Sequence, residues 1–485
     1  MSPEIAIVAA IALPLCGAVL IAACHRVPNL REAVTLLTAA ALFLTVATLV
    51  PGTLAEELPA VRLLEPLPGV AIALRVEPLG LLFALVASLL WIVSSVYSIG
   101  YMRGNGEAHQ TRFYVCFALA LASTMGVAFA GNLLTLFFFY EALTFATYPL
   151  VTHHGDAEAR QGGRTYLGVL LLTSTVFLFP AVVWTWLAAG TLDFVPGGIL
   201  AGKLSGTEVT LLLALFMFGI GKAALMPFHR WLPAAMVAPA PVSALLHAVA
   251  VVKAGVFAVI KIAVYIFGLG ASGASFDWLI YIAGFTILAA SIVALRSDNL
   301  KRRLAYSTVS QLSYIVLAVA VLAPLSIAAA ALHVASHAFG KITLFFAAGA
   351  IYTVSGKTEV SQLDGIGRRM PLTMAAFSIG ALSLIGIPPA AGFLSKWMMF
   401  QGAASAAHWT ALAVLAASTL LNAAYFLPIV HAAFLRAPSP GEVPHGEASW
   451  TMVTAMAFTA AVTVALPFAI ALPLGLARMV AGISP

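Results

Sequence analysis

Long apolar runs, separated by short polar turns, fill most of the chain. A helix needs about 20 predominantly apolar residues to cross the hydrocarbon core of a membrane. Fourteen segments meet this requirement, so the pattern predicts an all-α integral membrane fold with about 14 transmembrane helices. The predicted segments are 5–24, 32–51, 78–101, 112–130, 132–153, 164–188, 208–226, 241–268, 278–296, 304–323, 325–353, 372–402, 408–435 and 450–477.

The composition excludes the alternatives to a membrane protein. Of the 485 residues, 62% are hydrophobic and only 9% are charged. Soluble domains have about 25% charged residues, and disordered chains combine low hydrophobicity with high charge. The three cysteines form no CxxC pair, and an iron–sulfur cluster needs about four cysteine ligands. We therefore predict no catalytic or redox centre, no metal site and no cofactor in this chain.

The basic residues divide unevenly between the loops that these spans create. The odd-numbered loops contain fifteen: Arg26, Arg31, Arg103, Arg112, Arg160, Arg164, Arg230, Arg296, Lys301, Arg302, Arg303, Lys357, Arg368, Arg369 and Arg436. The even-numbered loops and the C-terminal segment contain four: Arg62, Arg75, Lys203 and Arg478. Basic residues are enriched in cytoplasmic loops, which predicts a multi-pass protein of the cell inner membrane with both termini on the outer, periplasmic side. They form no cluster on a soluble element, so no nucleic-acid partner is expected.

The five remaining basic residues lie inside apolar segments. They are Lys222, Lys253, Lys261, Lys341 and Lys396. A charge at the bilayer centre costs about 2.5–3.5 kcal/mol on insertion scales, so such residues face a bundle interior or a water-filled cavity. Lys261 is near the end of its span, where a lysine can extend to the interface. The other four, together with Glu141 as the only acid deep in a span, predict a polar path in the membrane.

Histidines accompany these lysines and favour protons as the transported ion. His333, His337 and Lys341 are spaced four residues apart, which places them along one face of a helix, and His247 precedes Lys253 in the next polar element upstream. Histidine changes charge near physiological pH. The alternatives are packing histidines, or a zinc site at His333 and His337, which lacks further ligands nearby. A sodium path would need several oxygen ligands, and Glu141 is the only deep carboxylate, so this chain alone is poorly suited to hold sodium, although backbone carbonyls at broken helices can supply ligands.

Two segments combine an interior lysine with prolines that interrupt a helix. The expected breaks are at Pro227, Pro239, Pro241, Pro388 and Pro389. Such breaks in corresponding places are typical of inverted repeats that enclose an ion path at the membrane midplane, although prolines can also merely kink packed helices. The predicted organisation is helices 1–3 in residues 1–111, a first inverted five-helix repeat in 112–268, a second in 278–435, and helix 14 in 450–485.

These motifs resemble one family of membrane proteins. The resemblance covers about residues 112–436 and includes Glu141, Lys222 followed by Pro227-Phe-His229-Arg-Trp-Leu-Pro233, Ala238-Pro-Ala-Pro-Val-Ser-Ala-Leu-Leu-His247, Lys253, His337-Ala-Phe-Gly-Lys341 and Gly386-Ile-Pro-Pro-Ala-Ala-Gly-Phe-Leu-Ser-Lys396. The family is that of the antiporter-like subunits of Mrp-type cation/proton antiporters, respiratory complex I and membrane-bound hydrogenases. Within it the chain is most similar to the D-type component of Mrp antiporters, although Leu232–Gly255 looks more like the large Mrp component.

The resemblance implies roles for the buried ionisable residues. It implies that Glu141 pairs with Lys222, that Lys253 carries the central relay, that His333, His337 and Lys341 continue it, and that Lys396 ends it. The function expected is proton translocation within a multisubunit sodium/proton antiporter, with other membrane subunits, protons, Na⁺ and the lipid bilayer as partners. The alternative is the same proton-pumping module inside complex I, where it would be part of a translocase, or inside a membrane-bound hydrogenase. A membrane protein that uses these lysines only structurally is the third hypothesis.

Overall fold

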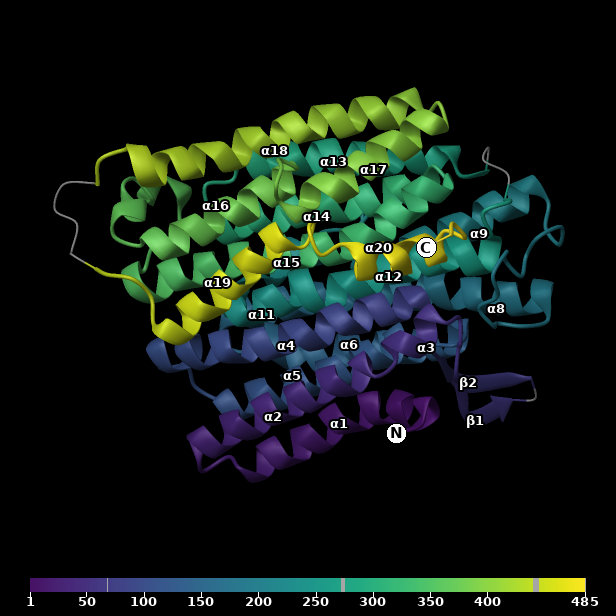
Figure 1. The fold of residues 1–485 in the computed structure, drawn as a ribbon, viewed down its shortest axis with the longest axis horizontal. Coiled ribbons are helices and arrows are strands. Elements are labelled where there is room, and N and C mark those ends of the chain that lie inside the picture. Colours follow the sequence, from purple (N-terminus) through teal and green to yellow (C-terminus); the bar gives the residue numbers. More distant parts are fainter. Residues whose placement is uncertain (68, 272–274, 439–444, 485) are drawn as a thin grey trace.

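The structure is a computed structural model that describes residues 1–67, 69–271, 275–438 and 445–484. It is a bundle of helices that run along one common direction (Figure 1). The predicted all-α membrane fold is confirmed in its helical character. The last residue of the predicted segment 450–485 lies outside the described residues.

The helices follow the order of the predicted apolar segments. The α-helices are α1 Pro3–Ala23, α2 Pro28–Ala47, α3 Val50–Leu54, α4 Pro78–Gly104, α5 Gln110–Ala128, α6 Leu133–Val151, α7 Ala157–Thr173, α8 Phe179–Ala189, α9 Gly206–Gly219, α10 Trp231–Ala234, α11 Ala240–Ala244, α12 Val251–Ile262, α13 Asp277–Arg296, α14 Leu300–Ala320, α15 Pro324–Ser355, α16 Pro371–Ile385, α17 Ala391–Ser405, α18 Trp409–Leu435, α19 Trp450–Ala465 and α20 Ala471–Val480. Shorter 3₁₀ or π segments are η1 Ser174–Leu178, η2 Gly221–Ala223, η3 Ala235–Val237, η4 Leu245–Val249, η5 Ala263–Phe267, η7 Val360–Gln362 and η8 Ile366–Arg368.

Ten of the described helical segments are long and apolar enough to cross a membrane. Shorter apolar helices make up the predicted spans 208–226, 372–402 and 450–477, because prolines or glycines divide these stretches. The predicted span 304–323 falls on α14, which is not among the ten. The multi-pass membrane character is therefore confirmed, whereas the number of 14 crossings stays a prediction.

Local sequence explains where several helices begin. Asn132 and Asp156 precede α6 and α7, and each side chain accepts a hydrogen bond from a backbone N–H of the first turn. Ser205 and Glu208 form a reciprocal capping box at the start of α9. These contacts satisfy backbone donors that have no partner within the helix.

Two segments lie at the centre of the bundle. Every residue of α12 is buried, and α15 is buried from Ser326 to Ile351. In Figure 1, α12 and α15 lie between α18 at one edge and α1 at the other. Both chain ends lie at the same end of the bundle as the two strands. The central helices therefore carry side chains that are shielded from lipid.

A β-hairpin, which the apolar pattern did not predict, precedes α4. Strands β1, Ala60–Leu67, and β2, Val70–Arg75, pair antiparallel. Gly69 has a φ of +78°, which glycine adopts without steric cost at the turn. The hairpin connects the second long helix to α4 outside the apolar spans.

Lys261 is not exposed at an interface, so the prediction that it could extend there is wrong. The side chain is fully buried, and its Nζ lies 3.0 Å from Oε2 of Glu77, just before α4. The ammonium also donates a hydrogen bond to the Ala130 carbonyl at 2.6 Å and lies 4.2 Å from the centre of the Phe194 ring. The ion pair joins the end of α12 to the start of α4.

We expect Glu77→Gln to destabilise the protein by about 3–5 kcal/mol, because it leaves a buried ammonium without its counter-charge. Thermal unfolding in detergent measures this. The control is Glu56→Gln, at an exposed carboxylate, and the double variant Glu77→Gln with Lys261→Met should recover part of the loss. A Glu77→Gln protein that unfolds like the wild type would show that the pair does not hold these helices together.

Candidate functional site

All the buried lysines except Lys253, together with the half-buried Lys301, have one kind of partner in common, a backbone carbonyl. Lys222 Nζ donates to the Tyr140 carbonyl at 2.6 Å, and Lys301 Nζ donates to the Ala238 carbonyl at 2.5 Å. Lys341 Nζ donates to the Leu304 carbonyl at 3.1 Å, and Lys396 Nζ donates to the Leu384 carbonyl at 2.6 Å. Lys261 makes the same contact with Ala130. A buried charge has to be paired with or hydrogen-bonded to polar atoms. These contacts explain how the bundle accommodates so many ammonium groups.

The first lysine lies at the first break in a helix. Helix α9 ends at Gly219, and Lys222 occupies the short η2 turn. Its ammonium bonds the Tyr140 carbonyl and the Thr144 hydroxyl, both at 2.6 Å, and lies 3.3 Å from the centre of the Tyr140 ring. Two hydrogen-bond acceptors and one aromatic ring, all on α6, therefore hold the Lys222 ammonium.

Glu141 is the next residue on α6, and it is only partly buried. One of its carboxylate oxygens is buried and has no hydrogen-bond partner among the described residues. The Lys222 ammonium bonds the backbone of Tyr140 instead of this carboxylate. The direct pairing of Glu141 with Lys222 that the resemblance implies is therefore not formed in this structure.

A glycine brings Lys222 close to the central helix. A Cβ at Gly255 on α12 would lie 2.4 Å from the backbone carbon of Lys222. Real Cβ atoms do not approach another atom that closely, so only glycine permits this contact. Gly255 lies half a turn after Lys253 on α12, and it brings the first break against the segment that carries the central lysine.

The centre of the site is a direct contact between two titratable groups. Nζ of Lys253 on α12 lies 2.7 Å from Nδ1 of His337 on α15. Both side chains are buried, with 0% and 1% exposure. No other hydrogen bond of the Lys253 ammonium is formed within the described residues, in contrast to the lysines that bind carbonyls. A lysine and an imidazole in contact can share or exchange one proton.

His247 and Lys341 meet on one turn of α14. The Nδ1 of His247 lies 3.1 Å from the Thr308 hydroxyl. Lys341 donates to the Leu304 carbonyl at 3.1 Å and also to the Ser307 hydroxyl. The Thr308 hydroxyl donates to the same Leu304 carbonyl at 2.9 Å. The turn from Leu304 to Thr308 thus connects the two residues.

The second break places Lys396 beside His333. Helix α16 ends at Ile385 and α17 begins at Ala391, and Pro388 and Pro389 lie between them. Lys396 caps the carbonyls of Leu384 and Ile385 at 2.6 and 3.3 Å. His333 contacts Ser395, the residue before Lys396, at 2.8 Å. Its ring centre lies 5.8 Å from that of His337, so the histidines continue from the centre towards this break.

The remaining prolines lie around the first break. Pro227 follows η2, and Pro239 caps α11, whose first turn contains Pro241. The predicted residues thus form one buried row from Lys222 through Lys253, His337 and His333 to Lys396, with Lys341 and His247 beside it. Glu141 lies at one end, on a face that is partly exposed.

The zinc alternative does not fit the contacts of the two histidines. His337 Nδ1 faces the Lys253 ammonium, and the two nitrogens of His333 face Ser395 and Gln311. None of these partners is a zinc ligand. Within the described residues, no group of three His, Cys, Asp or Glu side chains is placed to hold a metal ion.

Uncharged polar residues of the row were missed from the sequence. They are Tyr140, Thr144, Ser307, Thr308, Gln311 and Ser395, and all are buried. They carry no charge, so the search for ions in apolar segments could not find them. Each one contacts a buried lysine or a buried histidine.

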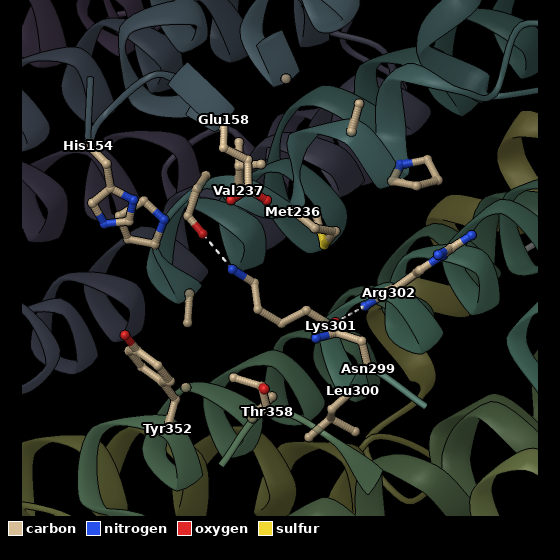
Figure 2. Close-up of a pocket in the computed structure, with 18 of the residues that line it drawn as sticks. His154, Glu158, Met236, Val237, Asn299, Leu300, Lys301, Arg302, Tyr352 and Thr358 are labelled. Atoms are coloured by element: carbon tan, nitrogen blue, oxygen red, sulfur yellow. Dashed lines mark hydrogen bonds between the residues drawn. The ribbon is translucent and has the colours of Figure 1, made fainter. Parts of the chain in front are cut away.

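A cavity of about 810 Å³ opens at the end of the bundle opposite the hairpin, and we call it the Lys301 cavity. Its lining includes the acidic residues Glu107, Asp156 and Glu158 and the basic residues Lys301, Arg302 and Lys357. Figure 2 shows Lys301 extending into the cavity towards the carbonyl to which it donates. This carbonyl belongs to Ala238, just before the short helix that leads to His247.

The α14 helix links the cavity to the row. Lys301, Leu304 and Thr308 are spaced three and four residues apart, which puts them on one helix face. Lys301 lines the cavity, and the other two contact Lys341 and His247. The path along this face contains lysine, carbonyl, hydroxyl and imidazole groups.

Two histidines share a carboxylate at the cavity mouth. Glu107 Oε2 lies 3.6 Å from His153 Nε2 and 3.4 Å from His154 Nε2. Burial opposes ionisation of Glu107, but the contacts with the two histidines outweigh it and lower its pKa from 4.5 to about 2. The Glu107 contact in turn raises the pKa of His154 above 6.5.

Comparison with known proteins places the chain in a family. The family model described as NADH:quinone oxidoreductase/Mrp antiporter, TM, matches residues 130–422. The chain belongs to this family. The match spans both breaks and every residue of the row from Glu141 to Lys396.

Individual relatives include components of redox enzymes and of antiporters. The N subunit of NADH-quinone oxidoreductase from Desulforudis audaxviator is 37% identical over 77% of this chain and 75% of its own length. The probable K(+)/H(+) antiporter A/B subunit of Rhizobium meliloti is 32% identical over 69% of this chain, but over only 33% of its own length. A chain in the solved structure of the Mrp complex from Dietzia sp. DQ12-45-1b has a TM-score of 0.89, 25% identity and coverage of 99% of this chain and 97% of that chain.

We expect Glu107→Gln to lower the pKa of His154 towards 6.5, because the variant removes the carboxylate that favours the imidazolium. The ion pair of Glu107 with His154 stabilises the mouth of the Lys301 cavity fully between about pH 4.5 and 6.5. This stabilisation weakens as the pH rises through the raised pKa of His154. Histidine NMR titration measures this, with Glu158→Gln in the same cavity as control. An unchanged His154 titration in Glu107→Gln would contradict the assigned pair.

Proposed function

We propose that this family member is a proton-translocating membrane subunit of a multisubunit monovalent cation/proton antiporter. The observation that carries the proposal is the contact of 2.7 Å between Lys253 and His337 inside a buried row of ionisable groups. Protons move along this row at mid-membrane. Glu141, Lys222, His247, His333, Lys341 and Lys396 are the further members of the relay.

The contacts of the row are suited to proton transfer. Hydroxyls and carbonyls hold the terminal ammonium groups, Lys222 and Lys396, at the two breaks. In the centre, Lys253 faces an imidazole that can accept a proton. Histidine gains and loses protons with little driving force near neutral pH. A proton moved from lysine to imidazole leaves one positive charge in the pair, so no additional charge is buried.

Relatives support a role inside a larger membrane complex. The Dietzia chain is part of an Mrp complex, and the Rhizobium relative carries the name of an antiporter component. The alternative is the same proton-pumping role in complex I or a hydrogenase, which the oxidoreductase component of Desulforudis supports. The proteins that co-purify in mild detergent separate the two: small antiporter subunits in one case, and iron–sulfur and flavin subunits in the other.

Glu141 marks the surface where we place a neighbouring membrane protein of the complex. It lies on α6 between Phe138 and Phe145, whose side chains are 53% and 57% exposed. A carboxylate in contact with hydrocarbon is costly, so a protein neighbour that covers this face stabilises the ionised form. We take Na⁺ as the coupled cation.

The orientation and repeat structure follow the sequence prediction. We place the basic loops in the cytoplasm, and both termini on the periplasmic side of the inner membrane. The Lys301 cavity is then the cytoplasmic access to the row. The two inverted repeats are α5 to η5 and α13 to α18, and each contains one break near which a lysine donates to a backbone carbonyl.

We expect Lys222→Ala and Glu141→Ala each to reduce proton-coupled transport by at least about a hundredfold, the scale of losing one proton-transfer group. Glu141→Asp should retain part of the activity, because the charge remains at a slightly shorter reach. Proton uptake by the purified complex in proteoliposomes measures both effects.

Lys203→Ala is the matched control, because Lys203 is an exposed lysine at the end of the bundle away from the Lys301 cavity. It should transport at the wild-type rate. Recovery of each variant in the complex shows that assembly persists. Normal transport by both Lys222→Ala and Glu141→Ala would contradict the proposed proton relay.

A further inference from the structure

Gln311 lies between His333 and the second break. Its side chain is fully buried on α14. The Nε2 of Gln311 donates to the Leu384 carbonyl at 3.3 Å, and its Oε1 lies 3.2 Å from Nε2 of His333. The same Leu384 carbonyl accepts a hydrogen bond from Lys396 at 2.6 Å. One amide therefore connects His333 to the carbonyl that binds Lys396.

The contacts of Gln311 determine which ring nitrogen of His333 carries the proton. A backbone carbonyl can only accept, so the NH₂ group of Gln311 must face Leu384. The amide oxygen then faces His333, and it also can only accept. His333 must therefore donate from Nε2. Because a neutral imidazole has one ring proton, its Nδ1 is an acceptor.

The other side of the ring fits this assignment and also allows protonation. The Ser395 hydroxyl, 2.8 Å from Nδ1, donates to it when His333 is neutral. When His333 takes up a proton at Nδ1, the new N–H donates to Ser395, whose hydroxyl turns to the Gly392 carbonyl at 3.3 Å. Release of that proton restores the first arrangement. Both charge states keep every hydrogen bond of the ring, and the Gln311 contact is unchanged.

We propose that Gln311 is a positioning residue that holds His333 in the Nε2–H tautomer, so that His333 takes up and releases its transferable proton only at Nδ1, on the side of Ser395. The inference rests on the proposed function of the row for its role in transport. The tautomer itself is a property of the contacts and is measurable without transport.

The test is NMR of the full-length chain in lipid bilayers with ¹⁵N-labelled histidine, in which protonated and unprotonated ring nitrogens have different shifts. A His333→Asn spectrum identifies the His333 signals among the 11 histidines. The wild type should show one neutral form with the proton on Nε2. Gln311→Leu removes the acceptor, so the Nδ1–H form should become populated. Gln311→Glu keeps an oxygen acceptor and should retain the Nε2–H form.

Asn422→Leu is the matched control. Asn422 also directs its side-chain amide at the Leu384 carbonyl, at 3.5 Å, but His333 is not among its hydrogen-bond partners in the described residues. The variant should leave the His333 tautomer unchanged. An Nδ1–H wild type, or a Gln311→Leu spectrum identical to the wild type, overturns the proposal.

Measurements of proton transport distinguish a failure of this inference from a failure of the proposed function. Gln311→Leu should slow proton uptake by the complex about tenfold or more, given the scale of proton-transfer contributions, and Asn422→Leu should not. If the tautomer changes as expected while Gln311→Leu and His333→Asn both transport normally, the positioning role stands and passage of protons through His333 is refuted.

Discussion

The cost of placing an ammonium group among apolar helices governs the interior of this protein. Lys222 and Lys396 have no carboxylate within hydrogen-bond distance among the described residues, so oxygen atoms of the backbone and of hydroxyls have to hold their charge. Carbonyls at the end of α16 are available because the chain breaks there at two prolines. The breaks are therefore part of the way in which charge is stabilised at membrane depth.

Lys253 departs from this arrangement, and the departure points to function. Its ammonium faces the imidazole of His337, a group that can take its proton. The lysines that bind carbonyls have no such acceptor at their Nζ within the part of the chain that the structure describes. The bundle thus combines ammonium groups that are held by oxygen atoms with one central pair, Lys253 and His337, between which a proton can be transferred. Gly255 brings α12, which carries Lys253, against the first break, and the Leu304–Thr308 turn binds Lys341 and His247.

Much of this arrangement could be predicted from single residues, but their partners could not. Apolar runs locate the helices, and a lysine inside such a run must be buried or reach the interface, so Lys222 and Lys396 were identified. The contact between Lys253 and His337 joins residues 84 positions apart, and no local pattern predicts it. Gln311 carries no charge, and Glu77 lies just outside its apolar segment, so neither stands out from the hydropathy pattern. The β-hairpin was missed because it lies between spans.

The most direct test of the account is a double-mutant cycle on the central pair. Proton uptake by the complex is measured for Lys253→Leu, His337→Leu and the double variant, with assembly verified for each. If the two residues perform one transfer step, each single variant loses transport, and the double variant is no slower than the slower single one. Reductions that multiply, as they do for independent sites, would contradict a proton transfer between Lys253 and His337.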